Sequence, residues 1–163
     1  MNRTPTTLDL SDARPTIIVD SREQSPLPIR RLPTVRAGLL AGDYGIAGAD
    51  TLFAVERKSI PDIVSCCAGS NRDRFERELC RLRGYRFKRL LIVGTQGEIA
   101  EGRYRSNVRP ASVLHSLAAW ECRYDVPVAF APTPHVAARQ VAAWASWFAR
   151  ELLRTADALK GRA

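Results

Sequence analysis

The sequence predicts a single α/β domain in which a mixed central sheet is flanked by helices. Short apolar or β-branched runs at 16–19, 52–55, 89–93 and 127–130 alternate with segments of helical period, a pattern typical of strands interleaved with helices. A chain of 163 residues with 45% apolar residues fits one domain with its own core. We assign 15–155 to this domain, 1–14 to a flexible N-terminal arm and 156–163 to a C-terminal tail.

The charge balance indicates a polyanionic partner. The 25 Lys and Arg residues against 17 Asp and Glu give a net charge of +8 and a pI near 9.9, which favours nucleic acid or an anionic membrane surface. No apolar run approaches the roughly 20 residues that span a bilayer, and the N-terminus lacks a signal-peptide core. We therefore expect no membrane partner and an intracellular location in the cytoplasm or nucleoid, or in the nucleus of a eukaryote.

The four cysteines predict neither a zinc site nor a disulfide framework. They show no C-x-x-C spacing, and Cys66 and Cys67 are adjacent. Cys80 and Cys122 fall at apolar positions of predicted helices. We expect these two as reduced thiols in the core.

The first strand, 16–19, ends at an acidic residue. Asp20 follows the apolar run directly, and ligands bind at the carboxyl ends of strands in open α/β sheets. A turn or cap role would equally explain Asp20. Prolines at 26, 28 and 33 make a long helix improbable in the next segment, and 34–40 then reads as a strand leading toward Asp43.

A charged hairpin follows, with its turn at 48–50 and its second strand starting at Leu52. That strand runs into Glu56, Arg57 and Lys58. Because side chains alternate in a strand, Glu56 and Lys58 share one face and Arg57 takes the other. Asp43 on the partner strand lets two carboxylates and a lysine converge, which is the outline of a Mg²⁺ phosphodiesterase site. The alternative is a set of exposed charges that only pair with one another.

Two helices are predicted after the hairpin. Ser59 caps the first, and Asp62 near its positive end has a complete structural explanation. The residues 69–71 break the chain before a basic helix at 73–85. Its arginines are either a solvated face or a contact surface for phosphates. With Arg22, the candidate DNA-binding arginines on this helix are Arg72, Arg74, Arg77 and Arg81.

The C-terminal half predicts helices at 111–123 and 134–153 around the strand at 127–130. The loop 94–97 is glycine-bearing but lacks P-loop spacing, so we expect no nucleotide cofactor. The last helix has a wide aromatic stripe that includes Trp144, Trp147 and Phe148. Such a stripe serves either core packing or an interface.

The acidic motifs together resemble one nuclease family. Gly42-Asp43, then Glu56-Arg57-Lys58, then three residues and Asp62 resemble the G-D…E-R-K-x-x-x-D signature of the XPF family of structure-specific endonucleases. Asp20-Ser21-Arg22-Glu23 resembles the family's D-x-R-E. The resemblance spans about 16–150 and implies a restriction-endonuclease-like fold, a mixed central sheet flanked by helices in a single domain.

The resemblance also implies a chemistry. Asp20, Asp43 and Glu56 would hold Mg²⁺, with Mn²⁺ able to substitute, and Lys58 would position the water or stabilise the transition state. Arg22 and Glu23 would be active-site neighbours. The role of Arg57 stays open between a buried pairing and a phosphate contact.

The expected substrate is branched, forked or flap DNA, recognised by shape and backbone. The resemblance implies a homodimer or heterodimer formed through the nuclease domain. The family's helix-hairpin-helix domain is not found here, so affinity is expected from the arginines, a dimer mate or another protein. The alternatives are a non-catalytic DNA-binding or scaffold subunit and a less structure-selective nuclease of the same fold.

The chain departs from the family pattern at two positions. Arg77 stands where the family has a glutamine, and Gly94 stands where the family strand ends in an acid. Glu98 is the residue that could supply a carboxylate in place of that acid.

Overall fold

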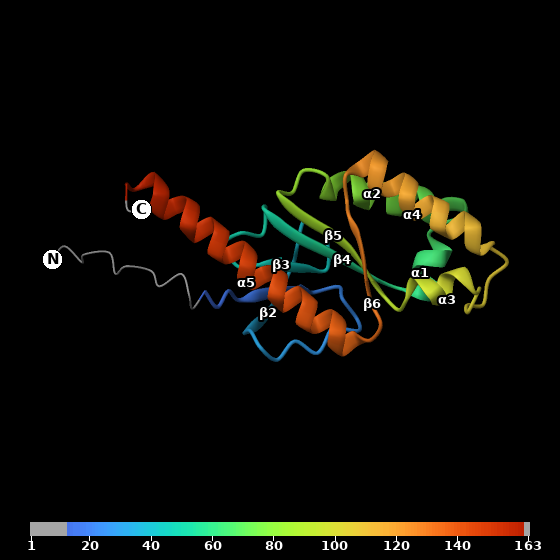
Figure 1. The fold of residues 1–163 in the computed structure, drawn as a ribbon, viewed down its shortest axis with the longest axis horizontal. Coiled ribbons are helices and arrows are strands. Elements are labelled where there is room, and N and C mark those ends of the chain that lie inside the picture. Colours follow the sequence, from blue (N-terminus) through green and yellow to red (C-terminus); the bar gives the residue numbers. More distant parts are fainter. Residues whose placement is uncertain (1–12, 162–163) are drawn as a thin grey trace.

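The computed structural model describes residues 13–161 and contains a mixed six-stranded sheet in the order β2-β1-β3-β4-β5-β6 (Figure 1). The strands are β1 Ile17–Asp20, β2 Thr34–Ala37, β3 Tyr44–Ile46, β4 Phe53–Ser59, β5 Phe87–Val93 and β6 Val128–Ala131. The helices are α1 Ile60–Ser65, α2 Gly69–Leu82, α3 Gln96–Ala100, α4 Pro110–Tyr124 and α5 Pro134–Leu159. Residues 1–12 of the predicted arm at 1–14 and residues 162–163 of the predicted tail at 156–163 lie outside the described residues.

The strand directions bring three chain segments to one edge of the sheet. β3 runs antiparallel to both β1 and β4, so β1 and β4 point the same way with β3 between them. The carboxyl ends of β1 and β4 therefore meet the amino end of β3. Asp20 ends β1, Asp43 precedes β3, and Glu56 lies in the second half of β4. The predicted convergence of these acids follows from this topology.

Two helical layers cover the sheet. The long helix α5 lies across one face, while α1, α2, α3 and α4 gather on the other side (Figure 1). Phe53 and Val55 pack in the core under α5, and Ala54 packs in the core under α1, α2 and α4. This alternation along β4 confirms the predicted faces of the strand. The fold is the expected restriction-endonuclease-like α/β arrangement.

Several element boundaries differ from the prediction. α2 begins at Gly69, so the residues 69–71 that were predicted to break the chain form its first turn, where polar residues are tolerated because the N–H groups have no partner within the helix. α5 continues to Leu159, since no proline or glycine interrupts it before Gly161. The segment 24–33 contains no helix, as its prolines predict.

The predicted burial of two cysteines is wrong. Cys80 and Cys122 are exposed, although we expected both in the core. Each lies next to a core residue, Leu79 or Trp120, but off the buried stripe of its helix. All four cysteines are free, as predicted. Among residues 13–161, no helix is both long enough and apolar enough to cross a bilayer.

Candidate active site

Backbone hydrogen bonds lock the three acidic segments together. The Asp20 N–H donates to the Asp43 carbonyl over 2.8 Å, and the Asp43 N–H donates to the Val55 carbonyl over 2.8 Å. Each acid is thus fixed by the main chain of its neighbouring strand. Because the sheet itself sets the spacing, the side chains are positioned before any ligand arrives.

Asp43 and Glu56 form a pair of carboxylates with perturbed acidity. Glu56 is only 5% exposed, and burial together with the charge of Asp43 raises the pKa of Glu56 to about 7. Burial likewise raises the pKa of Asp43 to about 6, although the Arg57 N–H donates to Asp43 Oδ2 over 2.7 Å. Burial and mutual repulsion both disfavour the anionic forms of these two acids. A nearby cation therefore stabilises the acids as anions.

Lys58 supplies one such cation. Its Nζ lies 2.5 Å from Glu56 Oε1 and 3.8 Å from Glu78 Oε2, and it stands 5.3 Å from the centre of the Phe75 ring. Burial alone would lower the pKa of Lys58, but the neighbouring carboxylates outweigh burial and raise it. Lys58 is therefore a charged donor at neutral pH, held at the mouth of the acidic pair.

Asp20 is engaged by its own surroundings. Its side chain is buried, with the residue only 2% exposed. Asp20 Oδ1 accepts from the backbone N–H and from Nε of Arg22. Asp20 Oδ2 accepts from Arg22 Nη2 and from the Leu39 N–H, the latter over 2.7 Å. The Arg22 hydrogen bond is the main reason that the pKa of Asp20 falls to about 2. In this arrangement Asp20 fixes the loop that leads to Asp43, and its role as a metal ligand stays a prediction.

Arg57 pairs with Glu23 on the far side of β4. Arg57 Nη2 lies 2.8 Å from Glu23 Oε1, and it also donates to the Ser25 carbonyl over 2.9 Å. Both side chains of the pair are largely buried. Of the two roles left open for Arg57, the buried pairing is the one present in the structure.

We expect Glu23→Gln to lower the free energy of unfolding by about 2–4 kcal/mol, because it leaves a buried guanidinium without its counter-charge. Glu101→Gln is the matched control, since Glu101 pairs with Arg103 where both are more than half exposed, and such a pair contributes about 0–1 kcal/mol. Urea unfolding of both variants measures the difference. Equal losses in the two variants would contradict the structural role of the Glu23–Arg57 pair.

The acids and Lys58 line a hollow in the protein surface. A pocket of about 230 Å³ contains Asp43, Glu56 and Lys58, together with Arg22 and Arg81. A second hollow of about 610 Å³ shares Arg22, Asp43 and Lys58 with it. The site is thus open to a large ligand, and arginines stand at its border.

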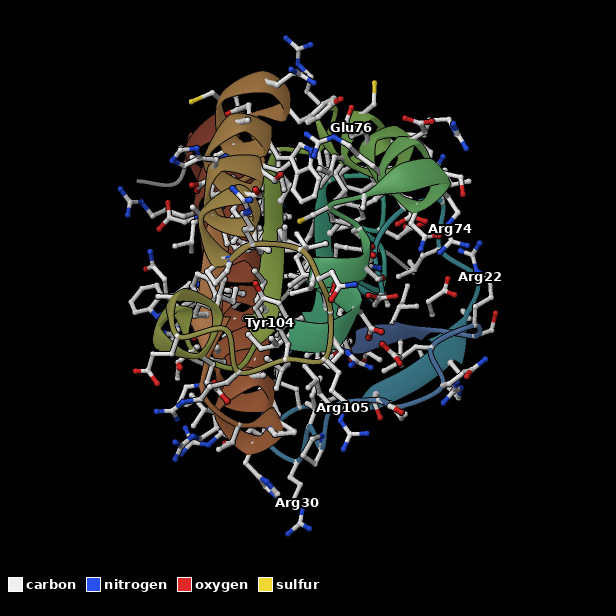
Figure 2. All side chains as sticks on the ribbon, turned by 90° about the vertical axis from the view of Figure 1, so that its right-hand side faces the viewer. Arg22, Arg30, Arg74, Glu76, Tyr104 and Arg105 are labelled. Atoms are coloured by element: carbon white, nitrogen blue, oxygen red, sulfur yellow. The ribbon has the colours of Figure 1, made fainter. Side chains whose placement is uncertain are left out.

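The predicted DNA-binding arginines separate into two groups. Arg22 and Arg81 line the first hollow, and Arg74 lines the second; Arg22 and Arg74 project from the same side of the molecule (Figure 2). Arg77 is exposed but lines neither hollow. Arg72 lies away from the site.

Arg72 braces α2 against α4. Its Nε lies 3.0 Å from Glu76 Oε1, Nη1 donates to Ser116 Oγ over 3.0 Å, and the guanidinium lies 5.2 Å from the Trp120 ring. Trp120 and Tyr124 also donate to Glu76. These contacts tie up Arg72, so they favour a structural role over a contact with DNA.

Glu78 is a site residue that the sequence reasoning missed. It lines the pocket and lies close to Lys58. The available signal was helical spacing, because Arg74, Glu78 and Arg81 recur at i, i+4 and i+7 of α2 and therefore share one face.

Gly94 shows why the family's acid is absent from the end of β5. Its φ is +140°, and a Cβ there would lie 2.4 Å from Ile60 Cγ1, so α1 leaves no space for a side chain. Glu98 does not take over, because its carboxylate accepts from the N–H and hydroxyl of Thr95 and caps α3.

The donor set fits Mg²⁺ better than it fits a metal that needs a complete protein cage. Within residues 13–161 no three His, Cys, Asp or Glu side chains are grouped to enclose an ion. Mg²⁺ commonly binds through one or two carboxylates and keeps several waters. Asp43 and Glu56, two hard oxygen donors in an open pocket, meet that requirement.

The raised pKa values of Asp43 and Glu56 predict that, without divalent ions, the folded protein becomes less stable as the pH rises. Asp43 and Glu56 ordinarily titrate at 3.8 and 4.5 but titrate in the folded chain at about 6 and about 7. The folded state then binds more protons than the unfolded state between about pH 4 and 7, so stability falls as pH rises through this window. Asp20 acts oppositely, but only below its ordinary 3.8.

Thermal unfolding in EDTA across pH 4–8 checks this, and Mg²⁺ should recover stability mainly at the high-pH end. Asp43→Asn should flatten the profile, because it removes one of the two titrating acids. A wild-type unfolding temperature that rises steadily between about pH 4 and 7 in EDTA would contradict the described electrostatics.

Comparisons with known proteins identify the family and the fold of the chain. The ERCC4 domain family matches residues 8–143. XPF from Aeropyrum pernix has the same fold, with a TM-score of 0.67 and 22% identity over 88% of this chain and 69% of that chain. The same protein solved in complex with DNA matches with a TM-score of 0.67 and 23% identity. That match covers 85% of this chain and 66% of the Aeropyrum pernix chain. No curated protein matches in sequence. Because the family match covers most of the chain and the fold agrees, the chain belongs to the ERCC4 domain family and is an XPF-type nuclease domain.

Proposed function

We propose that this domain is a divalent-metal-dependent DNA endonuclease that hydrolyses phosphodiester bonds in the pocket of Asp43, Glu56 and Lys58. The observation that carries the proposal is the pair of adjacent, partly desolvated carboxylates next to a lysine in an arginine-bordered hollow. Placing two carboxylates side by side in a partly buried site destabilises their charged forms and lowers the stability of the fold. A function that needs both carboxylates explains why the protein keeps them there.

Each residue then has a role in phosphodiester hydrolysis. Asp43 and Glu56 would hold Mg²⁺, with Mn²⁺ as a substitute, and the ion when bound would polarise a phosphoryl oxygen and acidify water. Lys58, still protonated, donates a hydrogen bond from Nζ to the attacking water or to a phosphoryl oxygen on which negative charge develops. Arg22 and Arg81 orient the phosphates on either side of the scissile bond.

Asp20 lines the same pocket as Asp43 and Glu56, and the Glu23–Arg57 pair lines the adjoining hollow. Asp20 holds the loop before Asp43 through the Leu39 N–H. Arg57 presents its backbone N–H to Asp43 while its side chain is fixed by Glu23. In the proposed site a main-chain donor thus orients Asp43 and the Lys58 ammonium orients Glu56, an arrangement in which small displacements of the supporting residues cost activity.

We infer that branched, forked or flap DNA is the substrate. The relative solved in complex with DNA supports a nucleic-acid substrate, and the arginines at the pocket border suit contacts to the backbone, which carry no sequence information. We also propose that the domain acts inside the cell as a homodimer or heterodimer. Trp147 on α5 is 61% exposed, as expected for a residue that a partner covers.

The test incubates the purified protein with fork, 3′-flap and linear duplex DNA of equal length, with Mg²⁺ or with EDTA, and maps the incision positions. The proposal predicts Mg²⁺-dependent cuts clustered at the branch point. Uniform cutting of all three substrates would point to a less structure-selective nuclease. Tight binding without any cutting would instead indicate a scaffold subunit.

A further inference from the structure

A second basic groove lies on the opposite layer of the domain from the active site. A hollow of about 400 Å³ opens between the segment 28–31 and the first turns of α5, and a neighbouring hollow of about 240 Å³ continues it along the helix. Both hollows are lined by Arg31, Arg139 and Ala142. Neither shares a lining residue with the hollows around Asp43, so the groove is a separate surface.

Four arginines of this groove have no acidic neighbour in its lining. Arg14, Arg30, Arg31 and Arg139 are exposed and line it, and within residues 13–161 no Asp or Glu lines it. In the described part of the chain none of these four arginines forms a salt bridge. At the active site, Arg22 is paired with Asp20, whereas Arg74 and Arg81 resemble the groove arginines in having no salt bridge within residues 13–161. Unpaired guanidinium groups along one hollow produce a positive potential that attracts a polyanion.

The rim of the groove is rigid. Leu27, Ile29 and Leu32 pack in the core beneath α5, so the side chains between them face outward. The Leu27 N–H donates to the buried Tyr44 hydroxyl over 2.8 Å, and the prolines of the segment fix its backbone. Arg30 and Arg31 are therefore presented from a preformed edge, which reduces the entropy lost on binding.

The same segment joins the groove to the active site. Arg57 holds the Ser25 carbonyl, and the roughly six residues from there to Arg31 span at most about 21 Å. One turn of a DNA duplex is about 34 Å, so the groove lies within one turn of the proposed cleavage point. Arg30 projects from the lower end of the molecule, away from Arg22 and Arg74 (Figure 2), so the two surfaces face different directions.

We propose that this groove binds the sugar–phosphate backbone of a second arm of the DNA substrate, distinct from the arm in the active site. The inference rests on the proposed endonuclease function and supplies a way for one domain to detect a branch. Planar guanidinium groups match phosphate oxygens bidentately, and the arginines are the charged residues that line both hollows. The phosphate backbone is the occupant that its charge favours.

The test compares two triple variants that remove the same charge. R30A/R31A/R139A deletes the groove arginines, and R83A/R109A/K160A deletes exposed basic residues that likewise have no salt bridge within residues 13–161 and line none of the four hollows. Binding of a fluorescent fork and of a short linear duplex is measured by anisotropy in EDTA at several salt concentrations, so that no cleavage is required. Cleavage of the fork in Mg²⁺ is measured separately, and unfolding temperatures verify that both variants fold.

For the groove variant we expect fork binding to weaken roughly 10- to 100-fold. The slope of log K against log salt concentration should also become shallower by about 2–3, because each lost contact with a duplex phosphate removes about 0.9 from that slope. KM for the fork should rise with kcat within about twofold, and the control variant should change each quantity far less. The single charge reversal Arg139→Glu should weaken binding in the same direction.

The two proposals fail separately. If the wild-type protein cleaves DNA but the groove and control variants bind the fork equally, the groove inference is wrong and the endonuclease stands. If binding depends on the groove but no DNA is ever cut, the enzymatic function is wrong and the groove stands. If polyglutamate of the same charge competes as well as duplex DNA for the wild-type protein but not for the groove variant, the groove is a protein-docking surface and the inference is overturned.

Discussion

Replacing Asp43 with Asn should lower DNA cleavage by at least ~10²-fold while making the metal-free protein more stable. Residues that only support a metal ligand contribute about 10- to 100-fold, and a ligand itself contributes more. The variant is expected to fold, since the amide oxygen can still accept the Arg57 N–H that now lies 2.7 Å from Asp43 Oδ2. Loss of function then comes from the lost charge rather than from a distorted sheet.

The gain in stability follows from the sign of the pKa shift. Above pH 7 the folded chain carries Asp43 as an anion although burial raises its pKa to about 6, and a neutral amide avoids that cost. Because Asp43 is only partly buried, we expect about 1–2 kcal/mol, which corresponds to about 2–8 °C in unfolding temperature. Scanning calorimetry in EDTA at pH 8 measures it.

The matched control is Asp73→Asn, the same chemical change at an exposed position of α2. This variant should leave both cleavage and unfolding temperature nearly unchanged. If Asp43→Asn cleaves at the wild-type rate, or if it destabilises the metal-free protein as a structural residue would, the assignment of Asp43 is wrong.

Replacing Lys58 with Met should lower kcat by about 10²–10³-fold, the size of effect seen when one preorganised donor to a transition state is removed. DNA affinity should change little, because the arginines at the pocket border, rather than Lys58, are expected to hold the backbone. The methionine keeps the apolar stem over the Phe75 ring, where Lys58 Nζ now lies 5.3 Å from the ring centre.

Lys88→Met controls for the loss of an ion-paired lysine. Lys88 is also largely buried and pairs with Asp125 over 2.7 Å, but it lines none of the active-site hollows. Single-turnover cleavage of the two variants separates the chemical step from binding. A Lys58 variant whose only defect is a raised KM would assign Lys58 to substrate binding instead of catalysis.

The chemistry of the hairpin was predictable because it depends on local rules. Strand alternation alone placed Glu56 with Lys58 and sent Arg57 to the other face, and both are observed. The prolines excluded a helix at 24–33. Asp62 is confirmed as a capping residue, since its N–H and carboxylate both bond Ser59 Oγ.

The remaining features depend on contacts between distant segments, which spacing does not encode. The engagement of Asp20 requires a backbone N–H from Leu39, and no local pattern predicts where that loop folds. Arg72 was grouped with the DNA-binding arginines because it lies on a basic helix, but its direction is set by Glu76 and by Trp120 on another helix. Glu78 enters the site only because α2 packs beside β4.

Binding of Mn²⁺ followed by electron paramagnetic resonance, together with cleavage in the same samples, tests the central claim most directly. The account predicts saturable Mn²⁺ binding at pH 8, cleavage that rises with the bound fraction, and loss of both in Asp43→Asn but not in Asp73→Asn. Cleavage that persists undiminished in EDTA, or Mn²⁺ binding that Asp43→Asn leaves unchanged, would contradict it.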